Sequence, residues 1–528
     1  CARITRGANA TPLAEKWNGN SGLAMLSSLD LGVFLFYMLL LVGVGVYFTR
    51  QQKGLKSYLL ADQNVHWIIV AVSVLAALFS GITYLGTPAE TYGHDLTYVW
   101  VLGSFVIATP ITTLVFLPFF RNLNLYTAYE YLDHRFDHRL HKLVSLLYVM
   151  RICGHLGLVV YAPALAIAAV TGWPLWMSIV CAGLAATLYT TMGGMKAVIW
   201  TDTLQFLILC GGIVLVLGFA VAAVPGGAPA VWQLAAAGGR TSFLPLTLDP
   251  TARITVWNAL LGGASINLIQ MVTDQISVQR YLTAPSLRDA QRALWLKLAA
   301  TLPLLLVFCL TGTALYSYYL AFPDREPILD KADQVLPYFV VHELPSPLPG
   351  LLIAAIFGAT MAVASAGINA LATTVLVDFG RVVHAEGQNE QQRVLLARGL
   401  TVGFGVLVTL LGLGLSRTGN TLIESIFLIQ GLFGGPSLGI FFLGALSRRA
   451  NGSGALIGAI VGAVAGALLG FSKPLFNYPI APLWISFAAA FVTYLAGLVA
   501  SLFFPAPGPA QQALVYGSGY KSVPGRFS

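Results

Sequence analysis

Long apolar stretches separated by short polar segments dominate the chain. A helix needs about 20 predominantly apolar residues to cross a hydrocarbon core of about 30 Å. Thirteen stretches meet this requirement, at 29–49, 66–92, 98–120, 143–170, 174–192, 196–224, 255–283, 291–321, 347–380, 393–416, 419–446, 453–471 and 482–504. Since lipid offers no hydrogen-bond partners to an exposed backbone, we predict an all-α membrane protein with about 13 transmembrane helices.

Two of these stretches contain polar interruptions. The second is interrupted at Ser80-Gly81 and again at Pro88, and the seventh between Gln270 and Gln275. The second to sixth stretches form one unit, 66–224, and the seventh to eleventh form another, 255–446. Because five is odd, the second unit enters the membrane from the opposite side. This organisation predicts a 5+5 inverted-repeat core with discontinuous first helices, which is typical of secondary transporters.

The segments outside the two units and the charged loops predict the topology. Residues 1–28 form a polar tail, 29–49 a peripheral span, 453–504 two further peripheral spans and 505–528 a second tail. One set of loops carries 18 Lys and Arg residues and the other set nine, and an excess of this kind marks the cytoplasmic side. We therefore predict a multi-pass protein of the plasma membrane, with the N-terminal tail outside and the C-terminal tail in the cytoplasm.

The composition excludes a soluble enzyme. Hydrophobic residues make up 57% of the 528 residues and charged residues only 9%, whereas about 25% is usual in soluble domains. The net charge of +8 fits basic cytoplasmic loops, so no nucleic-acid partner is predicted. The sequence shows no phosphate-binding loop, catalytic triad, HExxH motif or Cys/His ligand spacing. We predict neither an enzyme nor an ATP-driven pump, and no organic cofactor.

Six motifs resemble those of the sodium/solute symporter family, in the family's order. They are YLGTPAETY at 84–92, TAYEYL at 127–132, YAPAL at 161–165, GGMKAVIWTD at 193–202, VQRYL at 278–282 and GGPSLG at 434–439. The resemblance covers about residues 29–450, and over 161–202 it favours the branch that carries iodide, monocarboxylates and multivitamins. The sialic-acid and sugar symporters are more distant. The resemblance implies a transporter that moves a solute together with sodium.

The resemblance also implies a principal sodium site built mainly from backbone carbonyls, here those of Ala76, Phe79 and Ala359. Two adjacent hydroxyls normally complete this site, but Ala362 and Val363 occupy those positions in this chain. Hard cations in proteins prefer about six oxygen ligands, so the loss of two predicts weak sodium binding or water in their place.

Asp202 is a candidate cation ligand because a carboxylate inside a span must be paired, bind a cation or take up a proton. It lies six residues past Lys196, about 9 Å up its helix, and Ser365 lies at a similar depth on another span. The family's matching Asp serves a second sodium site in some members, so the resemblance implies Asp202 and Ser365 as ligands. The alternative is a carboxylate that pins two spans together.

The solute cavity implied by the resemblance contains seven candidate residues: Ser80, Thr83, Trp100, Ser104, His155, Asp274 and Gln430. His155 stands where sialic-acid relatives carry an Arg that binds the solute carboxylate, and a histidine disfavours bidentate binding of a carboxylate. The alternative for His155 is a packing role. Asp274 replaces an Asn found in many members and could pair with a cation, bind a cationic group or carry a proton. Lys297 is interpreted as a structural ion-pair partner.

Together these features predict a secondary active transporter that performs sodium-coupled symport of a small organic solute by alternating access. A monocarboxylate-like anion is the favoured solute. The alternative is proton-coupled symport through Asp202, Asp274 or His155, or uncoupled facilitation by the same fold. The predicted partners are the solute and the lipid bilayer, and a monomer is sufficient for transport.

The predicted orientation can be tested by thiol labelling. Cysteines introduced into 322–346 should react with an impermeant thiol reagent added from outside, and cysteines in 382–392 should not, because the two loops are predicted to lie on opposite sides. The reverse labelling pattern would contradict both the orientation and the assignment of the two repeats.

Overall fold

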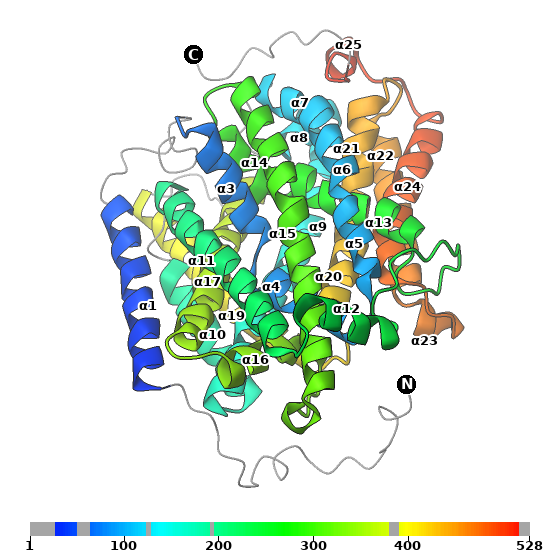
Figure 1. Cartoon of the computed structure of the whole chain (residues 1–528). Coiled ribbons are helices and arrows are strands. Elements are labelled where there is room, and N and C mark those ends of the chain that lie inside the picture. Colours follow the sequence, from blue (N-terminus) through cyan, green and yellow to red (C-terminus); the bar gives the residue numbers. More distant parts are fainter. Residues whose placement is uncertain (1–26, 50–63, 123–127, 191–194, 380–389, 517–528) are drawn as a thin grey trace.

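The computed structural model describes residues 27–49, 64–122, 128–190, 195–379 and 390–516, and within these ranges the regular elements are helices (Figure 1). The first half contains α1 (Ser28–Thr49), α3 (Trp67–Leu78), α4 (Gly81–Gly93), η3 (Leu96–Tyr98), α5 (Val99–Gly103), α6 (Phe105–Ile111), η4 (Thr112–Phe116), α7 (Leu117–Asn122), α8 (Glu130–Arg135), α9 (His138–Thr171), α10 (Leu175–Thr190), α11 (Met195–Ala223) and α12 (Gly227–Ala237).

The second half begins with α13 (Val256–Leu268), η5 (Ile269–Thr273), α14 (Gln275–Leu282), α15 (Leu287–Ala321), η6 (Pro323–Arg325), η7 (Ala332–Gln334), α16 (Val335–Glu343) and α17 (Leu348–Asp378). It continues with α19 (Glu390–Ser416), α20 (Leu422–Ile429), η8 (Gln430–Gly434), α21 (Gly435–Leu446), α22 (Gly452–Gly470), α23 (Ser472–Phe476), α24 (Pro482–Ser501) and α25 (Pro509–Gln512). Each of the thirteen apolar stretches predicted from the sequence therefore contains one or more helices.

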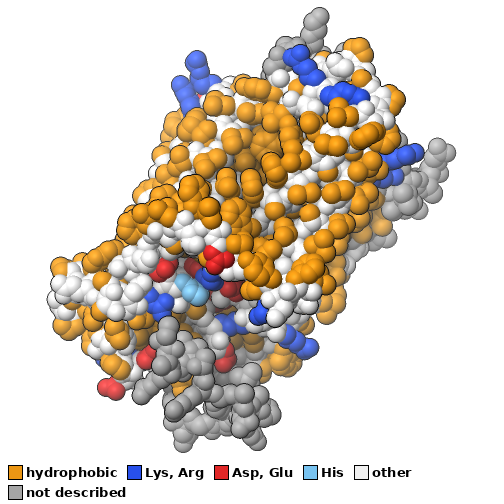
Figure 2. Space-filling model, turned by 90° about the vertical axis from the view of Figure 1, so that its right-hand side faces the viewer, with side chains coloured by type: hydrophobic (Ala, Val, Ile, Leu, Met, Phe, Trp, Pro, Cys, Tyr) orange, Lys and Arg blue, Asp and Glu red, His pale blue; other side chains and the backbone are white. Residues whose placement is uncertain are grey.

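The helices have the lengths and surfaces of a membrane protein. Among the described residues, nine helical segments are long and apolar enough to cross a membrane, and ten if the bent pair α3 and α4 is one span. Figure 2 shows that hydrophobic side chains cover most of one face of the molecule. The protein is an all-helical, multi-span membrane protein, as predicted.

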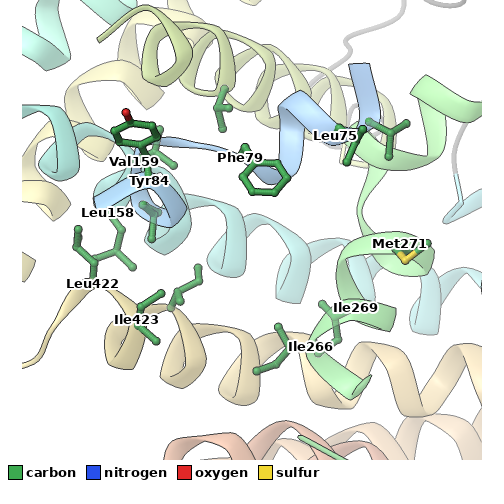
Figure 3. Close-up of a cluster of buried hydrophobic side chains, with 14 of the residues drawn as sticks. Leu75, Phe79, Tyr84, Leu158, Val159, Ile266, Ile269, Met271, Leu422 and Ile423 are labelled. Atoms are coloured by element: carbon green, nitrogen blue, oxygen red, sulfur yellow. The ribbon is translucent and has the colours of Figure 1, made fainter. Parts of the chain in front are cut away.

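Two of the spans are broken close to where polar residues interrupt the sequence. Between α3 and α4 the chain bends by 60°, with Phe79 outside regular helix and Ser80 extended at the N-cap of α4. Figure 3 shows Phe79 at the end of α3 and Tyr84 on α4 beyond the break. A Cβ at Gly81 would lie 2.7 Å from Thr360 Oγ1 of α17, so a residue without a side chain is needed there.

The second break follows the π-helical turn η5, where Asp274 is extended and its carboxylate accepts a hydrogen bond from Ile276 N at 3.0 Å. This cap satisfies one of the N–H groups that a new helix leaves unpaired. The predicted second interruption at Pro88 is wrong, because α4 continues through Pro88 to Gly93.

Glycines allow close packing of α22 against α24. A Cβ at Gly458 would lie 2.6 Å from Gly497 Cα, and a Cβ at Gly454 would lie 2.1 Å from Ser501 Oγ. Small residues at such crossings let helix backbones approach in lipid, where there is little hydrophobic drive for helices to associate. The glycine series in α22 is therefore a packing feature.

Gly458→Ala should destabilise the protein, because overpacking of this kind costs about 1–3 kcal/mol and outweighs the gain of up to about 1 kcal/mol in helix propensity. The matched control is Gly218→Ala in α11, where a Cβ would meet nothing within 4 Å. The midpoint of thermal unfolding in detergent should fall for Gly458→Ala and stay or rise for Gly218→Ala. Equal midpoints would contradict the packing role of Gly458.

Candidate functional site

A small cavity lies where α3, α11 and α17 meet, beside the break between α3 and α4. Its lining residues are Ala76, Phe79, Asp202, Gln205, Phe206, Leu209, Ala359 and Val363. Four of the five residues predicted for the sodium sites are therefore brought together at this cavity. The fifth, Ser365, is buried on α17 but is not among the lining residues.

The carboxylate of Asp202 is paired with a buried arginine. Its Oδ2 accepts a hydrogen bond from an Arg280 Nη2 donor at 2.9 Å, and both side chains are almost completely buried. Arg280 also donates from Nε to Ser73 Oγ at 3.2 Å. Among the described residues no hydrogen bond joins Asp202 to Ser365. Asp202 thus connects α11 to α14, which corresponds to the pinning role that the sequence left open, with Arg280 as the partner.

Gln205 was not identified from the sequence. It lies three residues after Asp202 on α11, and its side chain lines the same cavity while its Nε2 is buried with no hydrogen-bond partner among the described residues. Residues three apart on a helix share one face, so its spacing from Asp202 was the available signal. Val363 lines the cavity without a side-chain oxygen, so Asp202 and Gln205 are the lining residues with oxygen-bearing side chains.

A second polar cluster surrounds Arg151, in the middle of α9. Arg151 is 2% exposed, lies 3.3 Å from Asp274 Oδ2 and donates from Nη1 to Gln430 Oε1 at 3.1 Å. His155 lies one turn further along α9, is half-buried and has a buried Nδ1 without a hydrogen-bond partner in the described structure. Three predicted solute-site residues, His155, Asp274 and Gln430, are therefore arranged around Arg151, which was not among the residues predicted for the site.

The other four predicted solute residues lie around α4 to α6 and make their hydrogen bonds elsewhere. Thr83 donates to Leu78 O at 2.9 Å, beside the buried Ser80 at the helix break. Ser104 accepts a hydrogen bond from Asn267 Nδ2 at 2.8 Å, and Trp100 donates to the carbonyl of Phe243. In the described part of the chain none of the four is hydrogen-bonded to Arg151, so the structure does not join them directly to the cluster.

Short helix α14 is held by an ion pair at each end. Asp274 precedes its first residue and pairs with Arg151 of α9, while Arg280 lies in its last turn and pairs with Asp202 of α11. The cavity and the Arg151 cluster are therefore connected through one eight-residue helix. A movement of α14 relative to α9 and α11 would have to break both pairs or carry their partners along.

Charged side chains also gather beyond the end of α4. Arg253, in the segment before α13, donates to Glu90 Oε2 at 2.8 Å and to Glu424 Oε1 of α20 at 3.1 Å. Nearby, Asp333 accepts a hydrogen bond from Leu422 N at 3.1 Å, and burial raises the pKa of its carboxyl to about 6. These contacts fasten α4, α13 and α20 together at this end of the molecule.

Comparison with known proteins identifies the family. The model of the Sodium:solute symporter family matches residues 58–462. This chain belongs to the sodium:solute symporter family.

Relatives in this family place the chain in the predicted branch. It is 32% identical over 465 residues to a putative sodium-dependent multivitamin transporter of Drosophila melanogaster, covering 86% of this chain and 76% of the relative. It is 34% identical over 440 residues to the sodium-dependent multivitamin transporter of Oryctolagus cuniculus (82% and 68% covered). It is 31% identical over 465 residues to sodium-coupled monocarboxylate transporter 2 of Bos taurus (86% and 74% covered).

Solved structures support the same assignment. A sodium-coupled sialic acid symporter in a substrate-bound outward-open state superposes with a TM-score of 0.81 at 28% identity, covering 91% of this chain and 99% of that one. A nucleobase-cation-symport-1 family transporter shares the fold with a TM-score of 0.52 at 14% identity, over 87% of this chain and 97% of that one. The predicted family, with multivitamin and monocarboxylate transporters nearer than the sialic acid symporter, is confirmed. The chain is a sodium-coupled symporter of small solutes and not an enzyme.

The buried Arg151–Asp274 pair in this symporter can be tested with a double-mutant cycle. Arg151→Gln or Asp274→Asn alone should destabilise the protein by about 3–5 kcal/mol, because each leaves an opposite charge buried without its partner. The double variant should regain part of that loss, which would appear as a partly recovered midpoint of thermal unfolding.

The matched control is Arg325→Gln, which removes an arginine that is 58% exposed from its pair with Glu343. Its effect should stay below about 1 kcal/mol, since exposed ion pairs contribute little. Strictly additive losses in the Arg151→Gln/Asp274→Asn variant would show that the two charges do not depend on each other.

Proposed function

We propose that this symporter uses an inward sodium gradient to import a small organic anion, with monocarboxylates as the favoured class, across the plasma membrane. The relatives named for sodium-coupled monocarboxylate and multivitamin transport support the solute class. One observation carries the proposal: the break between α3 and α4 lies beside a cavity lined by Ala76, Phe79 and Ala359, the residues implied for the sodium site.

The proposed sodium ligands are backbone carbonyls freed by the break. The last four carbonyls of a helix have no intrahelical partner, and because α3 ends at Leu78, Ala76 is one of these four. Phe79 follows outside the helix, and Ala359 contributes from α17. We propose Gln205 as a side-chain oxygen donor that partly replaces the hydroxyls absent at 362 and 363. With Asp202 already paired to Arg280, this site relies on dipoles more than on charge.

The anionic solute is supported by two buried cations. The interpretation of Lys297 as an ion-pair partner is wrong, because among the described residues no carboxylate lies within ion-pair distance of it. Its Nζ lies 3.6 Å from Met271 Sδ and 4.2 Å from the centroid of the Phe105 ring. Arg151 is paired with Asp274, whose Oδ2 lies 3.3 Å from Nη2, and Nη2 makes no further hydrogen bond in the described structure. The solute carboxylate in this proposal approaches Arg151 and Gln430, with His155, Ser80, Thr83, Trp100 and Ser104 shaping the remainder of the cavity.

Alternating access in this proposal uses two inverted five-span units, 66–224 and 255–446. Both units begin with a broken helix, α3 with α4 and α13 with α14, and this shared feature supports the repeat. In this proposal the ion pairs of Arg253 with Glu90 and Glu424 must break before solute can enter from the outside. Helix α14 transmits movement between the sodium cavity and the Arg151 cluster.

Proton coupling is the second candidate, and it is considered because Ala362 and Val363 provide no hydroxyls for the principal sodium site. Without hydroxyls there, the principal site has fewer oxygens than a sodium ion prefers. A proton taken up by Asp202, Asp274 or His155 would replace sodium as the driving ion in that case. Uncoupled facilitation by the same fold would need neither ion.

Uptake into proteoliposomes distinguishes these candidates. Purified protein is tested with a short-chain monocarboxylate, a vitamin that carries a carboxylate, iodide and a neutral sugar, under imposed sodium or proton gradients at two pH values. We expect saturable sodium dependence, little effect of pH and a preference for the monocarboxylate. Sodium-independent uptake driven by a proton gradient would replace the proposal with the second candidate, and uptake driven by neither gradient would show facilitation.

Gln205→Leu should raise the sodium concentration for half-maximal uptake roughly tenfold or more, because one contact to a charged group contributes about 1.5–3 kcal/mol. Gln233→Leu, at an exposed position of α12, is the matched control and should change nothing. Solute affinity at saturating sodium should be similar in both variants. An unchanged sodium dependence in Gln205→Leu would remove Gln205 from the ligand set.

A further inference from the structure

Two histidines and an aspartate lie together where α8 meets α9, remote in sequence from the helix breaks. Asp133, His138 and His141 each offer a ligand atom, and these atoms all lie within 4.8 Å of one another. Helix α8 ends at Arg135 and α9 begins at His138, so the turn between them folds Asp133 back over the first turn of α9. His138 and His141 are three residues apart and share one face of α9.

Each of the two histidines has a buried ring nitrogen without a hydrogen-bond partner in the described structure. Nδ1 of His141 and Nε2 of His138 are buried and make no hydrogen bond, and Nε2 of His141 has only the Asp378 carboxylate at 3.2 Å; the His141 residue is 7% exposed. Leaving a buried polar atom without a partner costs about 1–3 kcal/mol, and such atoms in native proteins are rare. A neutral imidazole has one nitrogen with a lone pair and one with a proton, so a bound cation would satisfy one nitrogen of each ring.

A second carboxylate stands behind His141. Asp378, at the end of α17, lies 3.2 Å from His141 Nε2 and accepts a hydrogen bond from Ser145 Oγ at 2.5 Å. A carboxylate that orients one ring nitrogen is the usual companion of a histidine whose other nitrogen binds a metal, because it fixes the tautomer and raises the basicity of the ligand. On the other side of the cluster, His138 Nδ1 lies 3.4 Å from Asp133 Oδ1.

The charges around the cluster favour a cation. The N-terminus of α9 is the positive end of a helix dipole, which by itself disfavours a bound cation. Asp133 and Asp378 offset it, as does Asp137, which caps α9 by accepting from Leu140 N at 2.9 Å. Arg135, the nearest buried cation in sequence, is directed to the carbonyls of Gly444, Ser447 and Ala450.

We propose that Asp133, His138 and His141 bind a divalent transition-metal ion of the zinc class, with Asp378 as a positioning residue for His141. Two imidazoles and one carboxylate are ligands that zinc prefers, and three protein ligands leave a coordination position for water. Sodium is a hard cation that prefers oxygen ligands, so this site is chemically distinct from the cavity beside α3. The bound metal joins the α8–α9 turn, through His141 and Asp378, to the end of α17.

The first test is zinc binding to the tag-free full-length protein in detergent after treatment with a chelator. We expect one equivalent of zinc to bind and to raise the midpoint of thermal unfolding. His138→Ala, which removes a half-exposed side chain, should weaken binding at least about tenfold and abolish the thermal shift. His134→Ala is the matched control, since His134 is an exposed histidine on α8 outside the cluster, and it should bind zinc as the unmodified chain does.

A second measurement separates a metal site from a merely structural cluster. Cobalt(II) substituted for zinc should give the visible absorption of a site with nitrogen and oxygen ligands, and His138→Ala should lose that spectrum while His134→Ala keeps it. Asp378→Asn should weaken binding about 10–100-fold without removing the stoichiometric site. Absence of zinc binding by the unmodified chain, or equal binding by His138→Ala and His134→Ala, would overturn the proposal. Neither result depends on sodium coupling or on the solute.

Discussion

Inside a membrane, a charge or a backbone group without a partner is costly, and the rest of this structure depends on how the chain meets that cost at its two helix breaks. The break between α3 and α4 is buried against α17, where Thr360 would have to shift if residue 81 carried a side chain. At the second break the Asp274 carboxylate caps α14 and also pairs with Arg151. Each break is therefore held by neighbouring helices, and carbonyls at the end of α3 are left beside a cavity.

Helix α14 links these features. Its two flanking charges, on Asp274 and Arg280, pair with partners on α9 and α11, which belong to the first unit in sequence. One pair lies next to Gln430 and the other borders the cavity beside α3. Because a buried charge without its partner is costly, a movement of α14 that carries its partners along is favoured over one that breaks the pairs. That constraint gives the proposed coupling of sodium and solute a physical route.

The two proposed cation sites illustrate a difference in ligand chemistry. The cavity beside α3 offers carbonyl and amide oxygens, with its one lining carboxylate neutralised by Arg280. The cluster at the start of α9 offers imidazole nitrogens backed by carboxylates. Hard cations select the first kind of site and transition metals the second, so the two sites do not compete for one ion.

The sequence by itself predicted the helices, a break in each of the two spans, the family and four of the residues around the cavity, because apolar length, the polar interruptions and the order of the motifs are local properties of the chain. It did not determine which side chains pair with one another. Asp202 was matched to Ser365 by depth along two spans, yet it pairs with Arg280 of α14. Arg151, Gln205 and the Asp133–His138–His141 cluster were likewise found only in the structure. Ion pairs and ligand sets join residues that are distant in sequence or separated by a turn, and only the packing of helices decides which side chains meet.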